Sequence, residues 1–220
     1  MIKNLTCSIA LTLVLCSGAR PPVVIGESAP PTASSMPVMV ERWNRSSIRH
    51  SWLGRVDKVT RRIKNHKKRY EQASAKCGVP WEVIAALHNM ESGGSFTRHL
   101  HEGSSLKGRT RYVPKGRPVD GSPPFTWEES AYDVLYKLKR MDRIKWSDLG
   151  VSLYHCEKYN GLGYLKYHQD VNSPYMFSGT NLYTSGKYVA DGRWSQSAVS
   201  KQVGVAPILI KLGYAKHGQK

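Results

Sequence analysis

The spacing of apolar residues along the chain predicts a mainly helical protein. Between residues 47 and 75 apolar side chains recur at helical intervals and form one stripe, at Ile48, Trp52, Val56, Val59, Ile63 and Tyr70. A second apolar run starts after Pro80 and ends at Ser92. Proline at the start of a helix and glycine just past its end, here Gly93, are typical boundary residues.

Three more helices are expected in the C-terminal half. Thr126 followed by Glu129 matches a capping box, which marks a helix start. Periodic apolar residues predict helices over 147–159 and 195–212 as well. Residues 99–125 are rich in glycine and proline and predict loops, with at most a small hairpin near 109–113. The fold class that follows is mainly α with little β.

The first 19 residues have the pattern of a secretory signal peptide. Lys3 precedes a short apolar run over 9–15, and small residues follow at 17–19. This run is shorter than the roughly 20 apolar residues that span a bilayer. We therefore expect an exported protein, periplasmic or extracellular. A lipid anchor on Cys16 is the alternative, although a leucine precedes that cysteine.

Charge indicates the class of partner. The 220 residues include 33 lysines and arginines against 16 aspartates and glutamates, so the formal net charge is +17. Residues 20–45 are rich in proline, serine and alanine and predict a flexible linker. A basic amphipathic helix follows over 46–75 and suits an anionic cell-wall or membrane surface. A nucleic-acid binder would also be basic, but no nucleic-acid fold signature is present, so no specific nucleic acid is expected.

The helix after Pro80 carries a carboxylate, Glu91, on its last turn. Glu91 lies on the same helical face as Ile84 and Leu87, so its side chain should point toward the apolar side. Desolvation raises the pKa of a carboxyl group, and an acid that stays protonated near neutral pH can donate a proton to a glycosidic oxygen. The alternative is a solvent-exposed Glu91 at a frayed helix end, or one paired with Arg98.

Two motifs carry a resemblance to a known group of enzymes. Glu91-Ser92 at the end of an apolar helix resembles the catalytic Glu-Ser of lytic transglycosylases and goose-type lysozymes, and Tyr159-Asn160-Gly161 resembles their Tyr-Asn-x-Gly motif. The wider pattern resembles phage and bacterial lysozyme-family peptidoglycan hydrolases; its segments are HLH, VPKGRP, YNGLGY, SPYMFSGTNLYTSGKYVADG and QVGVAPIL. The resemblance covers residues 76–212 and implies a lysozyme-like catalytic domain over 76–215, acting as a monomer.

The resemblance implies an enzyme that cleaves peptidoglycan at the MurNAc-GlcNAc β-1,4 bond, with no cofactor and no metal. Glu91 would protonate the leaving oxygen and later act as the base, while Ser92 and Tyr159 orient the acetamido group of the substrate. The residues expected to bind or position the glycan are Ser92, Tyr159, Asn160, Gly161, Tyr175 and Tyr183.

A hydrolase of this type usually needs a second carboxylate, whereas a lytic transglycosylase needs only the acid. Glu102 and Asp120 are the candidates for the second carboxylate. Residues 102–106 read EGSSL where the group usually has Asn-Gly-Asp-Pro-Leu, and Phe177 stands where tryptophan is usual. The missing aspartate is one place from which a second carboxylate could have come. A lytic transglycosylase is the first choice. A hydrolytic muramidase, and a glycan-binding protein without activity, remain as alternatives.

Two further groupings of residues suggest other chemistry. Cys77 and Cys156 are the only cysteines outside the predicted signal peptide, and an oxidising compartment would permit a disulfide between them; two buried free thiols are the alternative. His88, His99 and His101 lie near Glu91 in sequence and could suggest a metal site. Their spacing fits no zinc signature, so none is expected.

Overall fold

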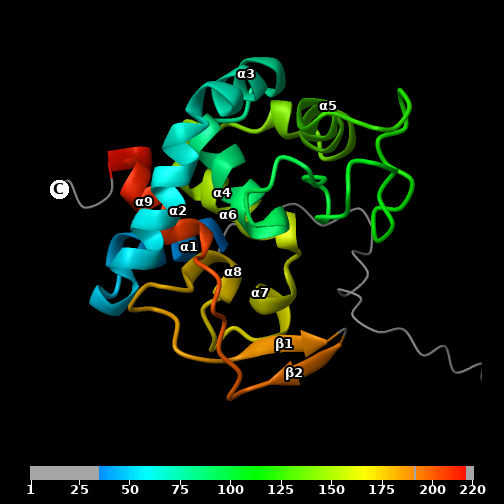
Figure 1. Cartoon of the computed structure of the whole chain (residues 1–220). Helices are drawn as coiled ribbons and strands as arrows, with labels where there is room; N and C mark the ends of the chain where they lie inside the picture. Colours follow the sequence, from blue (N-terminus) through cyan, green and yellow to red (C-terminus); the bar gives the residue numbers. More distant parts are fainter. Residues whose placement is uncertain (1–34, 191, 217–220) are drawn as a thin grey trace, which may run out of the picture.

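The computed structural model describes residues 35–190 and 192–216, and this part of the chain is mainly helical (Figure 1). The α-helices are α1 (Ser35–Arg45), α2 (Leu53–Asn65), α3 (Lys67–Cys77), α4 (Trp81–Ser92), α5 (Trp127–Tyr132), α6 (Leu149–Asn160), α7 (Gly163–Tyr167), α8 (Pro174–Phe177) and α9 (Val205–Leu212). One antiparallel hairpin is formed by β1 (Lys187–Ala190) and β2 (Arg193–Ser195). The predicted mainly helical class is therefore confirmed. None of the described helices has the length and apolar character needed to cross a bilayer.

Helix α4 lies at the centre of the fold, with α3, α6 and α9 packed around it (Figure 1). Every residue from Val83 to Glu91 is buried, so the helix has no solvent face over this length. Pro80 precedes its first turn, and Gly93 ends it in the left-handed region with φ of 64°. The predicted helix over 80–92 is confirmed. Its central place means that Glu91 is buried by neighbours on all sides, not by one apolar face.

Side-chain caps begin two other helices, and the one at Thr126 was predicted. Thr126 accepts a hydrogen bond from the backbone of Glu129, whose side chain bonds back to Thr126, which completes the capping box of α5. Helix α5 then continues into a π-helical turn, Asp133–Leu138. The Asp148 side chain caps α6 by accepting from Val151 N.

The basic segment over 46–75 forms two helices, not one. A short 3-10 turn, His50–Trp52, precedes α2, and the chain breaks at His66 before α3. The apolar stripe is confirmed, because Val56, Ile63 and Tyr70 are buried in the core. The charged residues between them face outward, as an amphipathic helix requires.

The predicted linker over 20–45 is wrong for residues 35–45, which form α1. Met39 and Trp43 are each only 1% exposed, and α1 packs against α6. Because α1, α2 and α3 contribute to the same core as α4, the boundary expected at residue 76 is not a structural boundary. The predicted signal peptide, Cys16 and the rest of the linker lie outside the described residues.

The helix predicted over 195–212 is wrong in its first half. Ser195 ends β2 and pairs with Lys187, and α9 begins only at Val205. A Cβ on Gly204 would lie 2.6 Å from the Met176 carbonyl oxygen, so the chain passes too close to α8 for another residue. The hairpin near 109–113 does not form either. Within the described residues this segment is a turn, in which Thr110 N donates to Arg117 O at 2.8 Å.

Candidate functional site

Glu91 ends α4 as a buried carboxylate that meets a tyrosine from a distant part of the chain. Its side chain is held by Tyr175, whose hydroxyl donates to Glu91 Oε1 at 3.0 Å, and Glu91 is 7% exposed. Burial, and then the charge of Glu91, raise the pKa of Tyr175 well above its ordinary value. The hydroxyl therefore keeps its proton and stays a donor. The exposed alternative for Glu91 is wrong, and Arg98 donates instead to the Gly103 carbonyl at 3.2 Å.

Tyr159, at the end of α6, connects this region to the loop that follows α4. Its ring is buried, and its hydroxyl donates to the Leu100 carbonyl at 2.9 Å. The Lys139 ammonium lies 4.3 Å from the centroid of the Tyr159 ring. Burial lowers the pKa of Lys139, and the nearby charge of Glu91 offsets only part of that shift. Lys139 was not among the residues predicted from the sequence, because the only local feature that marks it is its position just after an apolar helical segment.

The remaining motif residues have mainly local contacts. The Ser92 hydroxyl donates to the His88 carbonyl at 3.2 Å, and this hydrogen bond lies within α4 itself. Asn160 is exposed, and Gly161 ends α6 with φ of 102°, a value that favours glycine. Gly161 thus shapes the turn after Tyr159, as expected. Glycan contacts by Ser92 and Asn160 remain predictions.

Tyr183 has different contacts from Tyr175. It is 3% exposed, and its hydroxyl accepts from Ser200 N at 3.0 Å. Its carbonyl accepts from Arg49 at 2.7 Å. These bonds hold the segment before α9 in place. These contacts do not support a direct role for Tyr183 in sugar binding.

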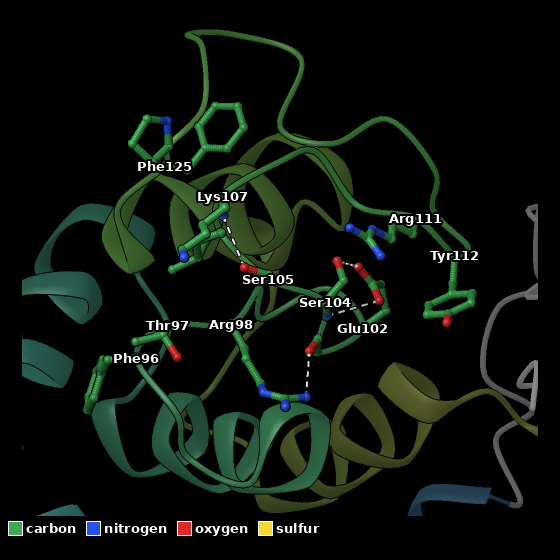
Figure 2. Close-up of a pocket in the computed structure, with 13 residues that line it drawn as sticks. Phe96, Thr97, Arg98, Glu102, Ser104, Ser105, Lys107, Arg111, Tyr112 and Phe125 are labelled. Carbon is green, nitrogen blue, oxygen red and sulfur yellow. Dashed lines mark hydrogen bonds between the residues drawn. The ribbon is translucent and has the colours of Figure 1, made fainter.

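The two candidate second carboxylates lie in different settings. Glu102 is 9% exposed and accepts from Ser104 through both the backbone N–H, at 3.1 Å, and the hydroxyl. It lines a pocket of about 830 Å³ (Figure 2). A Cβ on the next residue, Gly103, would lie 2.5 Å from the Glu91 carbonyl oxygen, so this loop rests directly on the end of α4. Asp120, by contrast, is exposed and paired with Lys137.

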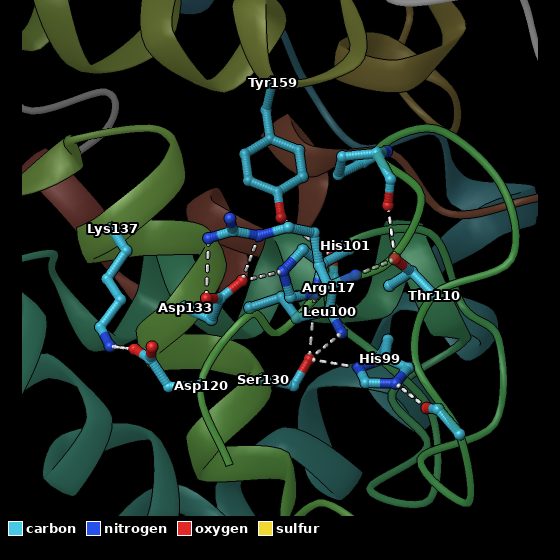
Figure 3. A network of polar contacts seen from close by, with 12 residues as sticks. His99, Leu100, His101, Thr110, Arg117, Asp120, Ser130, Asp133, Lys137 and Tyr159 are labelled. Atoms are coloured by element: carbon cyan, nitrogen blue, oxygen red, sulfur yellow. Dashed lines mark hydrogen bonds and ion pairs between the residues drawn. The ribbon is translucent and has the colours of Figure 1, made fainter. Parts of the chain in front are cut away.

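A buried polar network fixes the same loop to α5 (Figure 3). Ser130 Oγ lies 3.0 Å from His99 Nδ1 and 3.1 Å from His101 Nδ1, and it accepts from Leu100 N at 3.1 Å. His101 Nε2 in turn lies 2.8 Å from Asp133 Oδ2. Serine, histidine and aspartate could form a nucleophilic triad, but Ser130 is 0% exposed and no substrate can reach it. The network therefore has a structural role.

The histidines near Glu91 in sequence do not form a metal site. His88 lies within hydrogen-bond distance of the Tyr70 hydroxyl, at 2.9 Å, and of the Ser95 carbonyl, at 3.1 Å. Burial lowers its pKa to about 4. Across residues 35–190 and 192–216, no three His, Cys, Asp or Glu side chains are grouped so that they could hold a metal ion.

Cys77 and Cys156 are free thiols in the structure, and both are buried. The disulfide considered from the sequence is absent. Burial raises the pKa of Cys77 to about 11 and that of Cys156 to about 12, so neither thiol is a reactive thiolate near neutral pH.

Comparison with known proteins gave no relatives: no family model, no curated protein and no solved structure matches this chain. The functional assignment therefore depends on the side chains around Glu91 and on the motifs to which they belong.

Proposed function

We propose that this protein is a peptidoglycan-cleaving enzyme with a lysozyme-like helical domain. It acts on the MurNAc-GlcNAc β-1,4 bond, most simply as a lytic transglycosylase with Glu91 as its one catalytic carboxylate. The observation that carries the proposal is the setting of Glu91. The carboxyl group is buried at the end of a central helix, and it accepts a hydrogen bond from Tyr175, which lies 84 residues further along the chain.

This setting suits a group that must both give and take a proton. Burial favours the neutral carboxylic acid, whereas the Tyr175 hydroxyl, as a donor, favours the carboxylate. Glu91 first protonates the glycosidic oxygen as the bond to C1 breaks. It then takes the proton of the muramic acid C6 hydroxyl, whose oxygen attacks C1 and closes a 1,6-anhydro ring. Water is not consumed, and no cofactor is needed.

A hydrolytic muramidase is the second candidate, and Glu102 is the residue that favours it. The loop that carries Glu102 rests on the backbone of Glu91, and Ser104 fixes the carboxylate in place. A carboxylate at this place could activate water on the opposite side of the sugar. Asp120 is a weaker candidate, because its partner Lys137 holds it at the surface.

The basic surface of α2 and α3 supports a role at the cell envelope. Its exposed cations include Lys58, Arg61, Lys64 and Lys68. They would raise the local concentration of the protein on an anionic wall or membrane surface, and salt would weaken this attraction. Together with the signal-peptide pattern over 1–19, this is consistent with an exported protein.

Mass spectrometry of digested peptidoglycan tests the proposal. The wild type should release fragments with anhydromuramic ends, and Glu91→Gln should reduce their release by about 100-fold or more, because the variant lacks the acid. Glu82→Gln, on the first turn of the same helix, is the matched control and should cleave at the wild-type rate.

Other products would change the assignment. Reducing muramic ends would identify a hydrolase and direct attention to Glu102. Binding of peptidoglycan without cleavage, equal in wild type and Glu91→Gln, would show that the protein is a glycan-binding module and not an enzyme.

A further inference from the structure

The pocket beside Glu91 has a surplus of positive charge that glycan cleavage does not explain. Residues 96–107 supply most of its lining, and Arg111, Tyr112, Pro124 and Phe125 complete it. Gly103 belongs to this lining and also rests on the Glu91 carbonyl. The pocket therefore adjoins the end of α4, where the glycan bond would be cut.

Three cationic residues line this pocket: Arg98, Lys107 and Arg111 (Figure 2). All three residues are exposed, and in the part of the chain that the structure describes none of them forms an ion pair. The one carboxylate in the lining, Glu102, already accepts hydrogen bonds from Ser104. Arg98 donates to the Gly103 carbonyl, so Lys107 and Arg111 are the cations that the pocket presents to a ligand.

The lining also offers flat apolar surface. Tyr112 is 56% exposed, and Phe96 is partly exposed. Such a surface suits the short side chains and backbone of a peptide, whereas the cations suit carboxylates. A neutral sugar would gain little from three positive charges. The combination indicates an extended, acidic ligand.

We propose that this pocket binds the acidic stem peptide attached to muramic acid. The inference rests on the proposed function, because a glycan strand that crosses Glu91 brings the lactyl-linked peptide of its muramic acid into the neighbouring space. The carboxylates of the stem pair with Lys107 and Arg111, and its backbone lies along Tyr112. The pocket thereby selects peptide-bearing strands over bare ones.

Binding of a free stem tetrapeptide, L-Ala-γ-D-Glu-meso-diaminopimelate-D-Ala, to the full chain tests the pocket without any cleavage. Calorimetric titration should show saturable binding to the wild type. Lys107→Glu/Arg111→Glu should weaken it by about tenfold or more, because two attractive charges become repulsive. The matched control is Lys166→Glu/Arg193→Glu, which makes the same change in net charge at two exposed positions outside the pocket and should bind like the wild type. Equal weakening by both double variants, or no binding to the wild type, would overturn the inference.

A second arm separates this inference from the proposed function. Wild type should cleave peptide-bearing glycan strands about tenfold faster than strands stripped by an amidase, and Lys107→Glu/Arg111→Glu should lose that preference while still cleaving stripped strands. Equal wild-type rates on the two substrates would contradict the inference. If neither substrate is cleaved but the tetrapeptide binds in the pocket, the proposed function fails and the binding site stands.

Discussion

The Tyr175 hydroxyl is the hydrogen-bond donor that holds the Glu91 carboxyl group in place. It donates to Oε1 at 3.0 Å in a buried setting, where hydrogen bonds to a charged group are strong. Because burial and the charge of Glu91 keep Tyr175 protonated, this donor is present across the whole working pH range. Removing it should take away the hydrogen bond that orients Oε1 of Glu91.

Tyr175→Phe should therefore slow cleavage of purified peptidoglycan by about tenfold or more, because Oε1 of Glu91 loses the hydrogen bond that orients it. The rate would be measured from the release of soluble fragments. Tyr183→Phe makes the same chemical change at another buried tyrosine, whose hydroxyl accepts from Ser200, and should cleave at close to the wild-type rate. A similar loss in both variants would show that the bond to Glu91 is not its cause.

At the scale of elements, the loop after α4 is held between three helices. Gly103 rests on the end of α4, Tyr159 of α6 bonds to Leu100, and Ser130 of α5 bonds to the residues on either side of Leu100. Asp133 completes the attachment through His101 and through Arg117, whose two nitrogens donate at 2.7 and 2.8 Å. Burial raises the pKa of Asp133, but these hydrogen bonds lower it by more, so it lies below its ordinary value.

Asp133→Asn should destabilise the protein by about 3 kcal/mol at pH 7, because Arg117 and His101 lose a buried partner. Since the pKa of Asp133 is lower in the folded state, its contribution is present at neutral pH and is lost as the pH falls below about 4. Urea unfolding at pH 7 and at pH 3 would measure both effects.

The control for this change is Asp57→Asn, which breaks the exposed pair with Lys211. It should cost less than about 1 kcal/mol. If the two variants unfold alike at pH 7, the loop is not held by the buried network.

On the scale of the whole molecule, α1 closes the core over a buried acid. Glu157 of α6 is 1% exposed, and neither of its oxygens has a hydrogen-bond partner among the described residues. Burial raises its pKa to about 8, and the charge of Arg42 on α1 offsets only part of this shift. Glu157 is therefore neutral in the folded protein at pH 7 and ionised in the unfolded chain.

This sets a pH dependence of global stability. A pKa that is higher in the folded state gives stability that is full below about pH 4.5 and declines as the pH rises toward 8. Glu157→Gln should remove this decline and make the protein more stable than the wild type by roughly 4 kcal/mol at pH 9, with little difference near pH 4.5.

Urea unfolding of both proteins between pH 5 and pH 9 would measure the difference. Glu71→Gln, at an exposed position of α3 paired with Lys67, should show no comparable gain at alkaline pH. A constant difference between Glu157→Gln and the wild type at every pH would show that Glu157 is ionised in the folded state.

Features that depend on neighbours a few residues apart could be predicted from the sequence. Pro80 and Gly93 mark the two ends of α4, and Thr126 with Glu129 marks the start of α5, as predicted. These signals are reliable because caps and turns are made by local hydrogen bonds. The helical stripe from Val56 to Tyr70 also packed as expected. The position of Glu91 at a helix end followed from the same signals.

The surroundings of Glu91, by contrast, depend on contacts between distant segments of the chain. The bond from Tyr175, the approach of Gly103 and the place of Lys139 join segments far apart in the chain, and no local pattern encodes such pairings. Helix α1 was missed for the same reason: its segment has the composition of a linker, and Met39 has a core to enter only where α6 is in place. These segments come together because burying their apolar side chains outweighs the conformational entropy that the chain loses. Local propensity could indicate the position of Glu91 on a helix, but not the neighbours that surround it.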